Sequence, residues 1–286
     1  MISVKTSTVD SPVISKITKS FFEGMPKAST YLEEAQFGLR RILPLLQSLP
    51  NKARVLEVGS GPCILLAEIN QQFPNLMLQG IEPMGDGFAF FNDFINNVQF
   101  RKSQINLHQG SYETFPENGK WDAIFLINVF EHLVDWRDFL SFANKSLAEK
   151  GRLIILCPNY GFPYESHFHL PIIVNKSLTK MLFRKKIEYF ERNNDNAGLY
   201  QSLNFVRLRQ VRRAAKALGL NLCVNTEIIN EMIDRLDKDP SFKKRQNILA
   251  IPAQILKKTG LLNYLLKNKF LQNYLPYMQI TLSRKL

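Results

Sequence analysis

Short apolar runs that alternate with helical stretches are the feature that most limits how this chain can fold. Four runs of strand length end near a glycine, proline, asparagine or acidic residue, at 53–58, 76–81, 123–127 and 153–157. Between them, residues 63–73 and 136–150 carry apolar side chains at spacings of three and four, which is typical of crossover helices. Strands that alternate with helices predict a doubly wound α/β sheet, whose ligands bind beyond the carboxyl ends of the strands.

Further elements are predicted on both sides of this alternation. Residues 31–49 form an amphipathic helix kinked near Pro44, with Ser29 or Thr30 as its N-cap and one apolar face made by Leu32, Ala35, Leu39 and Ile42. Residues 206–218 form a basic helix that stops at Gly219, and 220–224 continue the sheet. Residues 278–282 alternate like an antiparallel strand at the sheet edge.

Composition excludes several classes of protein. The chain has 286 residues, 45% apolar and 22% charged, an ordinary globular profile. Its three cysteines are odd in number and far apart, so they indicate neither a disulfide framework nor a thiolate metal cage. No apolar run approaches the roughly 18 residues of a spanning helix. The first twenty residues lack the apolar region and cleavage site of a signal peptide, so a cytoplasmic location is expected.

Positive charge is concentrated in the second half of the chain. The formal net charge is +12, yet residues 1–175 hold 15 basic and 17 acidic side chains, whereas 176–216 hold 11 and 3. Two segments that interrupt the alternation, 159–205 and 229–276, carry most of this charge and are expected to be insertions at the substrate end. Such asymmetry suggests an anionic partner: nucleic acid, a membrane surface or an acidic substrate. The simpler interpretation is that basic amphipathic helices cap the core and aid solubility.

A glycine turn follows the first predicted strand. Gly59-Ser60-Gly61 lets the chain turn sharply and brings backbone N–H groups against a ligand at the start of the next helix. The second strand ends at Glu82, 21 positions after Gly61, where a carboxylate can accept both hydroxyls of a ribose. This constellation points to a dinucleotide or to S-adenosylmethionine.

With these motifs the sequence resembles the class I S-adenosylmethionine-dependent methyltransferases. The resemblance rests on residues 54–61, Glu82, the 108–116 segment and the 121–133 segment with its Glu-His ending. It covers about residues 30–160 closely and implies a Rossmann-like, doubly wound, seven-stranded sheet with an antiparallel last strand and helical insertions that form a substrate lid. The expected domains are a helical cover at 1–50, a cofactor-binding core at 51–158, and the rest of the sheet with the basic insertions at 159–286.

The resemblance also implies which residues bind S-adenosylmethionine. Eleven residues are expected to contact the methionine part, the ribose, the adenine or the sulfonium of the cofactor. They are Glu57, Gly59, Ser60, Gly61, Glu82, Pro83, Met84, Gly110, Ser111, Tyr112 and, through its backbone carbonyl, Asn128. The sequence departs from the family at two positions. Cys63 stands where a third glycine is usual, and Ser111 replaces the common aspartate. Because a small thiol can pack between helix and sheet and a hydroxyl can still bond the adenine edge, weaker binding is expected, not lost binding.

Candidate catalytic residues are His132, after the fourth strand, and Glu165 and His167, in a loop rich in aromatic side chains after the fifth. Each also has a structural interpretation, as a helix cap or as part of a packed lid. Ubiquinone-biosynthesis O-methyltransferases have a similar Glu-x-x-Glu-His ending that holds a divalent cation, but Asn128 replaces the first acid here. His167 and His169 alone are too few ligands, so no metal is predicted.

We therefore expect a methyltransferase that methylates an oxygen of a small or lipid-linked acceptor, glycan-like or quinone-like. The basic insertions favour an acceptor that either bears phosphate or is associated with a membrane, and the expected location is the cytoplasm or the inner face of a membrane. An RNA methyltransferase is the main alternative, since Arg207, Arg209, Arg212 and Arg213 could meet phosphates. Against it, no appended RNA-binding module is recognisable, so nucleic acid is the less favoured partner. A methyltransferase-like module without catalysis is a third hypothesis, supported only by Cys63 and Ser111.

Overall fold

The computed structural model describes residues 14–24, 28–83, 105–116, 119–194, 197–238 and 247–285. The chain divides into two compact units, Met1–Phe125 and Leu126–Leu286. Among the described residues no helix is both long enough and apolar enough to cross a bilayer.

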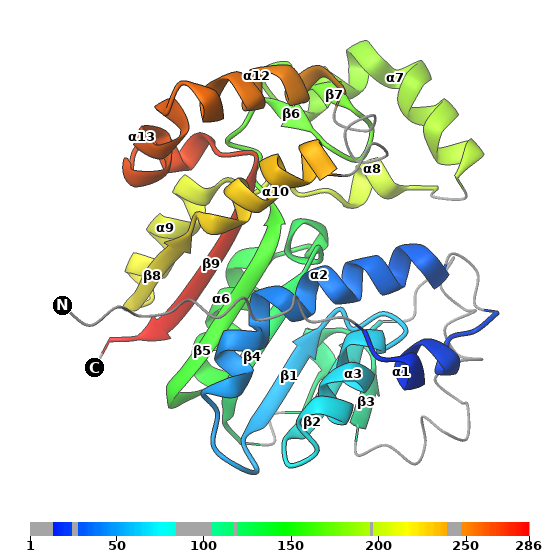
Figure 1. Ribbon diagram of the computed structural model, residues 1–286, viewed down its shortest axis with the longest axis vertical. Helices are drawn as coiled ribbons and strands as arrows, with labels where there is room; N and C mark the ends of the chain where they lie inside the picture. The colour runs from blue at the N-terminus through cyan, green and yellow to red at the C-terminus, as the bar shows by residue number, and fades with distance from the viewer. Residues whose placement is uncertain are drawn as a thin grey trace. The chain divides into compact units, whose positions relative to one another are not determined.

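The first unit carries the glycine turn. In chain order it contains α1 (Lys16–Phe21), α2 (Ala28–Gln47), β1 (Arg54–Val58), α3 (Ile64–Gln72), β2 (Met77–Glu82), β3 (Ile105–Gln109), the 3-10 helix η1 (Tyr112–Thr114) and β4 (Trp121–Ile127), which runs across the division. Figure 1 shows α2 and α3 side by side beside β1 and β2. Ala35, Leu39 and Ile42 of α2 are buried as predicted, because the spacing of three and four places them on one face.

The second unit carries the Glu-His ending and the basic segments. It contains η2 (Phe130–His132), α6 (Trp136–Ser146), β5 (Leu147–Pro158), the hairpin of β6 (Tyr164–Glu165) and β7 (Leu170–Pro171), α7 (Lys176–Asn193), α8 (Leu199–Ser202), α9 (Leu208–Ala217), β8 (Leu220–Asn225), α10 (Glu227–Lys238), α12 (Asn247–Lys258), α13 (Leu261–Lys267), η3 (Leu271–Tyr274) and β9 (Tyr277–Arg284). In Figure 1 the strands β5, β9 and β8 lie side by side. The segment 159–205 therefore holds a small hairpin and helices, and most of the described residues of the segment 229–276 lie in α10, α12, α13 and η3.

The seven-stranded sheet has the order β3-β2-β1-β4-β5-β9-β8. β1 pairs in parallel with β2 and β4, whereas β9 pairs antiparallel with both β5 and β8. This confirms the predicted doubly wound α/β fold with an antiparallel last strand. The expected edge position of the last strand was wrong: β9 is an interior strand, and β8 forms the edge. Alternation alone cannot distinguish these positions, because Met278, Ile280 and Leu282 are buried in either case.

Two local boundaries differ from the sequence prediction. α2 begins at Ala28, so Ser29 and Thr30 are helical residues and not N-caps. α6 ends at Ser146, four residues before the predicted end, because Leu147 takes an extended backbone (φ −66°, ψ 140°) and opens β5. Pro44 lies inside α2. Gly219 has φ +71° and directly follows the basic helix, as a helix-ending glycine should.

Candidate active site

The glycine turn after β1 is tied to the end of β2. Gly59 and Gly61 have φ of +74° and +51°, a backbone region that favours glycine. The backbone N–H groups of Gly59 and Ser60 both donate to the carbonyl of Ile81, at 2.8 and 3.1 Å. The N–H of Gly61 donates to Oε2 of Glu82 at 2.7 Å. The structure therefore brings the acid predicted to bind ribose against the loop predicted to bind the methionine part.

Glu57 lies beneath this turn with an unsatisfied oxygen. Its side chain is buried, and Oε2 has no hydrogen-bond partner among the described residues. Burial, and secondarily the charge of Glu82, raise the pKa of Glu57 well above its usual range. Because buried carboxylate oxygens are normally hydrogen-bonded, this atom fits a ligand that brings an N–H donor or a positive charge.

The segment expected to line the adenine begins beside the same acid. The N–H of Gly110 donates to the carbonyl of Glu82 at 3.0 Å. Ser111 has an extended backbone at the start of η1, and the side chain of Tyr112 is buried. Pro83 is exposed, and Met84 lies outside the described residues.

Two residues near this turn were missed by sequence reasoning. Gly80 of β2 faces Ser60, whose Oγ would lie 2.7 Å from a Cβ at position 80, so a larger residue there would displace the Ser60 side chain. Tyr31 of α2 lies close enough to Glu82 that this charge, after burial and Glu34, raises its pKa. Cys63 is fully buried, as expected, with φ +60°. The position of the usual third glycine therefore keeps a backbone that favours glycine.

Asn128 ends β4 with a left-handed backbone, φ +54°. Asparagine adopts this conformation more readily than most residues. Its N–H donates to the carbonyl of Leu156 at 2.8 Å, and its Oδ1 accepts a hydrogen bond from the hydroxyl of Tyr277. The side chain is thus held within the second unit, and the predicted role of its backbone carbonyl at the sulfonium stays a prediction.

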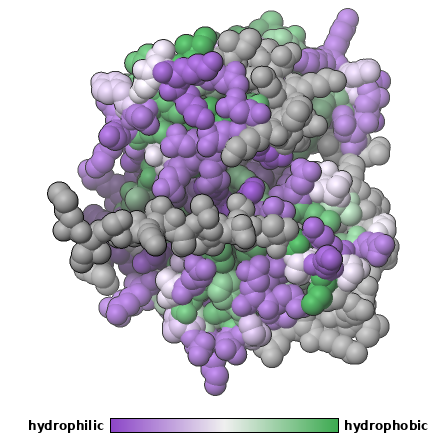
Figure 2. All heavy atoms as spheres, in the orientation of Figure 1, coloured by the Kyte–Doolittle hydropathy of each residue, from purple (hydrophilic) through white to green (hydrophobic). Residues whose placement is uncertain are grey.

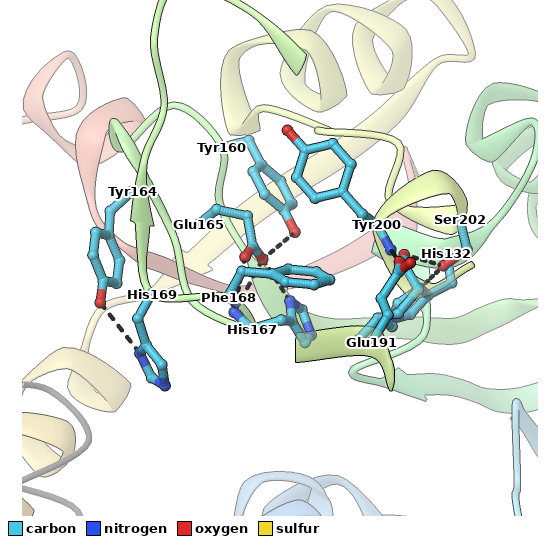
Figure 3. Close-up of polar contacts among 11 residues, drawn as sticks. His132, Tyr160, Tyr164, Glu165, His167, Phe168, His169, Glu191, Tyr200 and Ser202 are labelled. Carbon is cyan, nitrogen blue, oxygen red and sulfur yellow. Dashed lines mark hydrogen bonds and ion pairs between the residues drawn. The ribbon is translucent and has the colours of Figure 1, made fainter. Parts of the chain in front are cut away.

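Glu165 is the centre of a hydrogen-bonded loop after β5 (Figure 3). Its carboxylate is fully buried and accepts from the backbone N–H groups of His167 and Phe168 at 3.0 and 2.7 Å, and from Nδ1 of His167 at 2.7 Å. The Tyr160 hydroxyl donates to it at 3.4 Å. Burial alone would raise the pKa of Glu165, but these bonds and His167 lower it below the usual value. The carboxylate therefore fixes the orientation of the His167 imidazole.

His132 and His167 come together although 35 positions separate them in the sequence. Their rings lie edge to face, with centroids 5.7 Å apart. Nδ1 of His132 lies 2.8 Å from Oγ of Ser202. Burial, and then the charge of His167, lower the pKa of His132 to about 4, with Glu165 acting in the opposite direction. His132 is thus a neutral imidazole at neutral pH.

The remaining histidines lie elsewhere. His169 pairs with the hydroxyl of Tyr164 at 3.3 Å, and Figure 3 shows this pair on the far side of Glu165 from His132. His108 of β3 contacts Thr114 at 3.1 Å, as expected for a residue near a strand end. Two other side chains of the aromatic loop, Tyr160 and Phe168, are packed in a buried cluster with Tyr200 and Leu203. The packing interpretation of the loop therefore holds for these aromatics.

Asn159 supports this loop and was not singled out from the sequence. Its Nδ2 donates to the carbonyls of Asn273 and Leu275 at 3.1 and 2.7 Å, and its Oδ1 accepts from the N–H groups of Gly161 and Leu208 at 3.0 and 2.9 Å. One buried side chain thus joins the loop after β5 to η3 and α9. An asparagine just after a strand carries no distinguishing local signal.

Comparison with known proteins identifies the family. A family model described as a methyltransferase domain matches residues 31–224. The chain belongs to this family. Two uncharacterised proteins of Mycobacterium tuberculosis, Rv1509 and MT1557, are each 30% identical to it over 215 residues, which cover 74% of this chain and 73% of theirs.

Solved structures share the fold at low identity. A mycolic acid cyclopropane synthase, CmaA1, solved with S-adenosylhomocysteine, is 15% identical with a TM-score of 0.53, covering 88% of this chain and 85% of that one. A phosphoethanolamine N-methyltransferase of Haemonchus contortus, solved with S-adenosylmethionine, is 14% identical with a TM-score of 0.51, covering 96% of this chain and 61% of that one. The predicted class I S-adenosylmethionine-dependent methyltransferase is confirmed as the class of this enzyme.

The residues around the turn fit the methyl donor. The unsatisfied oxygen of Glu57 suits its amino group, and the carboxylate of Glu82 suits its ribose hydroxyls. The role of each predicted binding residue is untested and stays a prediction.

Proposed function

We propose that this methyltransferase transfers its methyl group to a hydroxyl oxygen of a small or lipid-linked acceptor, glycan-like or quinone-like. The observation that supports this most is the pair of Glu165 and His167, joined at 2.7 Å through Nδ1. A hydroxyl is a weak nucleophile until it loses its proton, and an imidazole oriented by a buried carboxylate is a common acceptor of that proton.

S-adenosylmethionine supplies an activated methyl group when it is bound. In the first unit, Glu82 would accept hydrogen bonds from the ribose hydroxyls, Glu57 would meet the amino group, and the turn at residues 59–61 would hold the methionine part through backbone atoms. His167 takes the acceptor proton, and Glu165 stabilises the imidazolium that forms. His132 has too low a pKa to be an effective base near pH 7, so its proposed role is to accept a hydrogen bond that orients the acceptor.

The lipid-linked acceptor is supported by the surface of the basic segments. Exposed large apolar side chains occur on α7 at Met181, Leu182 and Tyr189, and near α13 at Leu261, Tyr264 and Phe270. Exposed lysines and arginines lie among them, including Lys180, Arg184 and Lys185 on α7. Figure 2 shows apolar surface among hydrophilic residues at the top of the view, the end of this unit that carries α7 and α12 in Figure 1. Such a mixture suits peripheral contact with an anionic membrane.

The RNA alternative loses part of its support. Of its four arginines, Arg212 donates to Oε1 of Gln272 at 2.7 Å, so this guanidinium is already engaged within the protein.

Two experiments test the proposal. Calorimetric titration with S-adenosylmethionine and S-adenosylhomocysteine should give micromolar binding, with NADH as the negative control. Formation of S-adenosylhomocysteine is then measured with quinol, lipid-linked sugar, amine and RNA acceptors. We expect turnover with a hydroxyl acceptor, strongly reduced in His167→Ala and retained in His169→Asn. Methylation of amines or RNA alone, or full activity of His167→Ala, would contradict the proposal.

Membrane contact is tested by sedimentation with vesicles. We expect binding to vesicles that contain phosphatidylserine, and loss of binding in high salt or in a Met181→Asp, Leu182→Asp double variant. Equal recovery with purely zwitterionic vesicles, or no sedimentation at all, would contradict it.

A further inference from the structure

The carboxylate of Glu131 and the imidazole of His132 lie close to the imidazole of His167, the proposed base. One potential ligand atom from each of Glu131, His132 and His167 lies within 4.8 Å of the other two. We propose that these three side chains bind a divalent transition-metal ion. The sequence predicted no metal because Asn128 stands where the resembling enzymes have their first acid, but the third ligand here comes from the β6–β7 turn.

The contact between His167 and Glu165 determines which nitrogen of the His167 ring carries the proton. The Glu165 carboxylate is surrounded by donors: two backbone N–H groups, the Tyr160 hydroxyl and Nδ1 of His167. An ionised carboxylate only accepts, so Nδ1 carries the proton. In the neutral imidazole the lone pair is then on Nε2.

The same argument applies to His132 through Ser202. The Ser202 hydroxyl has one proton and donates it to the carbonyl of Leu199 at 2.8 Å. Its oxygen must therefore accept at its 2.8 Å contact with Nδ1 of His132, which makes Nδ1 the protonated nitrogen. Both histidines present Nε2 as acceptor and use Nδ1 for a fixed partner, the arrangement typical of metal-bound histidines.

The elements that carry the ligands are held in place. The side-chain amide of Asn204 donates to the carbonyls of Phe130 and Leu133 on either side of Glu131 and His132, at 2.8 and 3.0 Å. Its backbone N–H donates to the carbonyl of Glu131 at 2.7 Å. The β6–β7 hairpin and Glu165 hold His167. Ligand atoms around a tetrahedral ion lie roughly 3–3.5 Å apart, so the three atoms, which lie within 4.8 Å of one another, would have to move closer together to bind an ion.

The donor set indicates the class of ion. Two imidazole nitrogens and one carboxylate suit Zn²⁺, Co²⁺, Mn²⁺ or Fe²⁺, whereas Mg²⁺ and Ca²⁺ prefer oxygen ligands. Glu131 is fully buried, and a nearby cation offsets the cost of burying its charge. The inference concerns ion binding alone and does not depend on the proposed function: an imidazole whose Nε2 binds an ion cannot also accept a proton there, so the base role proposed for His167 applies to the ion-free protein.

The test is ion binding without cofactor or acceptor. Full-length protein without an affinity tag is dialysed against chelator and titrated with Co²⁺, followed by visible absorption. We expect one Co²⁺ per chain, displaced by Zn²⁺ but not by equal Mg²⁺. His132→Ala, His167→Ala and Glu131→Gln should each lose binding. His169→Asn is the matched control, because it removes an imidazole two positions from His167 while asparagine tolerates φ +53° at that position; it should bind as the parent does.

Ser202→Ala keeps the test decisive should a ligand variant fail to fold. Ser202 is exposed and is not itself a ligand, so Ser202→Ala removes the partner of Nδ1, together with the hydrogen bond to the carbonyl of Leu199, and should weaken Co²⁺ binding about 10–100-fold. Stoichiometric binding lost in the ligand variants and weakened in Ser202→Ala supports the site. Absence of binding, or equal binding in parent and ligand variants, overturns it and leaves the hydroxyl-acceptor proposal intact. Methylation by the chelated parent that is lost in His167→Ala supports the base role of His167 separately from the ion site.

Discussion

Replacing Glu165 by glutamine tests whether its charge holds the loop that carries His167. The variant keeps the size of the side chain but exchanges one acceptor oxygen for an NH₂ group. In the parent, Oε1 meets the backbone N–H and Nδ1 of His167, and Oε2 meets the N–H of Phe168. Whichever way the amide is oriented, at least one buried donor faces another donor.

The cost follows from the number and kind of these bonds. A buried donor left unsatisfied costs about 1–3 kcal/mol, and hydrogen bonds to a charged group exceed neutral ones by about 1 kcal/mol. The free energy of unfolding should therefore fall by about 2–5 kcal/mol. At about 2–4 °C per kcal/mol, a loss of about 3 kcal/mol lowers the unfolding midpoint by roughly 6–12 °C.

Thermal unfolding followed by circular dichroism measures this loss. Glu188→Gln is the matched control, because Glu188 is also a glutamate of the second unit but forms an exposed i, i+4 pair with Arg184. That variant should unfold as the parent does, since exposed ion pairs contribute little. A Glu165→Gln midpoint within 2 °C of the parent would refute the reasoning.

Three further predictions concern the cofactor and turnover. Glu82→Ala should weaken S-adenosylhomocysteine binding about 10–100-fold in calorimetry, because it loses charged hydrogen bonds of about 1.5–3 kcal/mol. The control variant Glu23→Ala, at an exposed glutamate, should bind as the parent does. An unchanged affinity in Glu82→Ala would mean that this acid does not bind the ribose. Burial raises the pKa of Glu57, and below that pKa the protonated carboxyl loses its attraction for the cofactor's amino group, so cofactor affinity should fall as the pH drops. Calorimetry between pH 5 and about 7.5, where an α-amino group stays charged, should show this fall in affinity. The Glu57→Gln variant should not show it. His132→Ala should lower kcat more than it changes cofactor affinity; a loss confined to cofactor binding would place His132 outside the reacting site.

Most of the fold was predictable because its signals are local. A strand buried on both faces needs a continuous apolar run, so β1, β2 and β4 were found within two residues of their bounds. β5 is longer than its apolar run because its first residues, Leu147–Arg152, include charged side chains at a surface end that hydrophobicity does not mark. The interior place of β9 depends on pairing with two strands, and sequence pattern does not encode which neighbours a strand selects.

The glycine turn at residues 59–61 and its acidic partner could likewise be predicted from the sequence. Gly59, Gly61 and Glu82 are linked by one strand–helix–strand unit, whose geometry fixes where the second strand ends relative to the turn. Gly80 and Tyr31 were not predicted, because each matters through a neighbour in the folded chain: Ser60 for Gly80 and Glu82 for Tyr31.

The grouping of the candidate catalytic residues could not be predicted from local sequence signals. The sequence supplied His132, Glu165 and His167 as separate candidates, and it supplied the chemistry of each side chain. Folding of the second unit alone brings His167 to His132 and Glu131 and assigns the proton of each imidazole through Glu165 and Ser202. Contacts between residues tens of positions apart arise when whole helices and strands pack together. The same hydrophobic pattern is compatible with many such packings, so the sequence pattern does not select one of them. The family and its cofactor could therefore be predicted from the sequence. The arrangement of His132, His167 and their neighbours that can hold a proton or an ion is determined only by the tertiary structure.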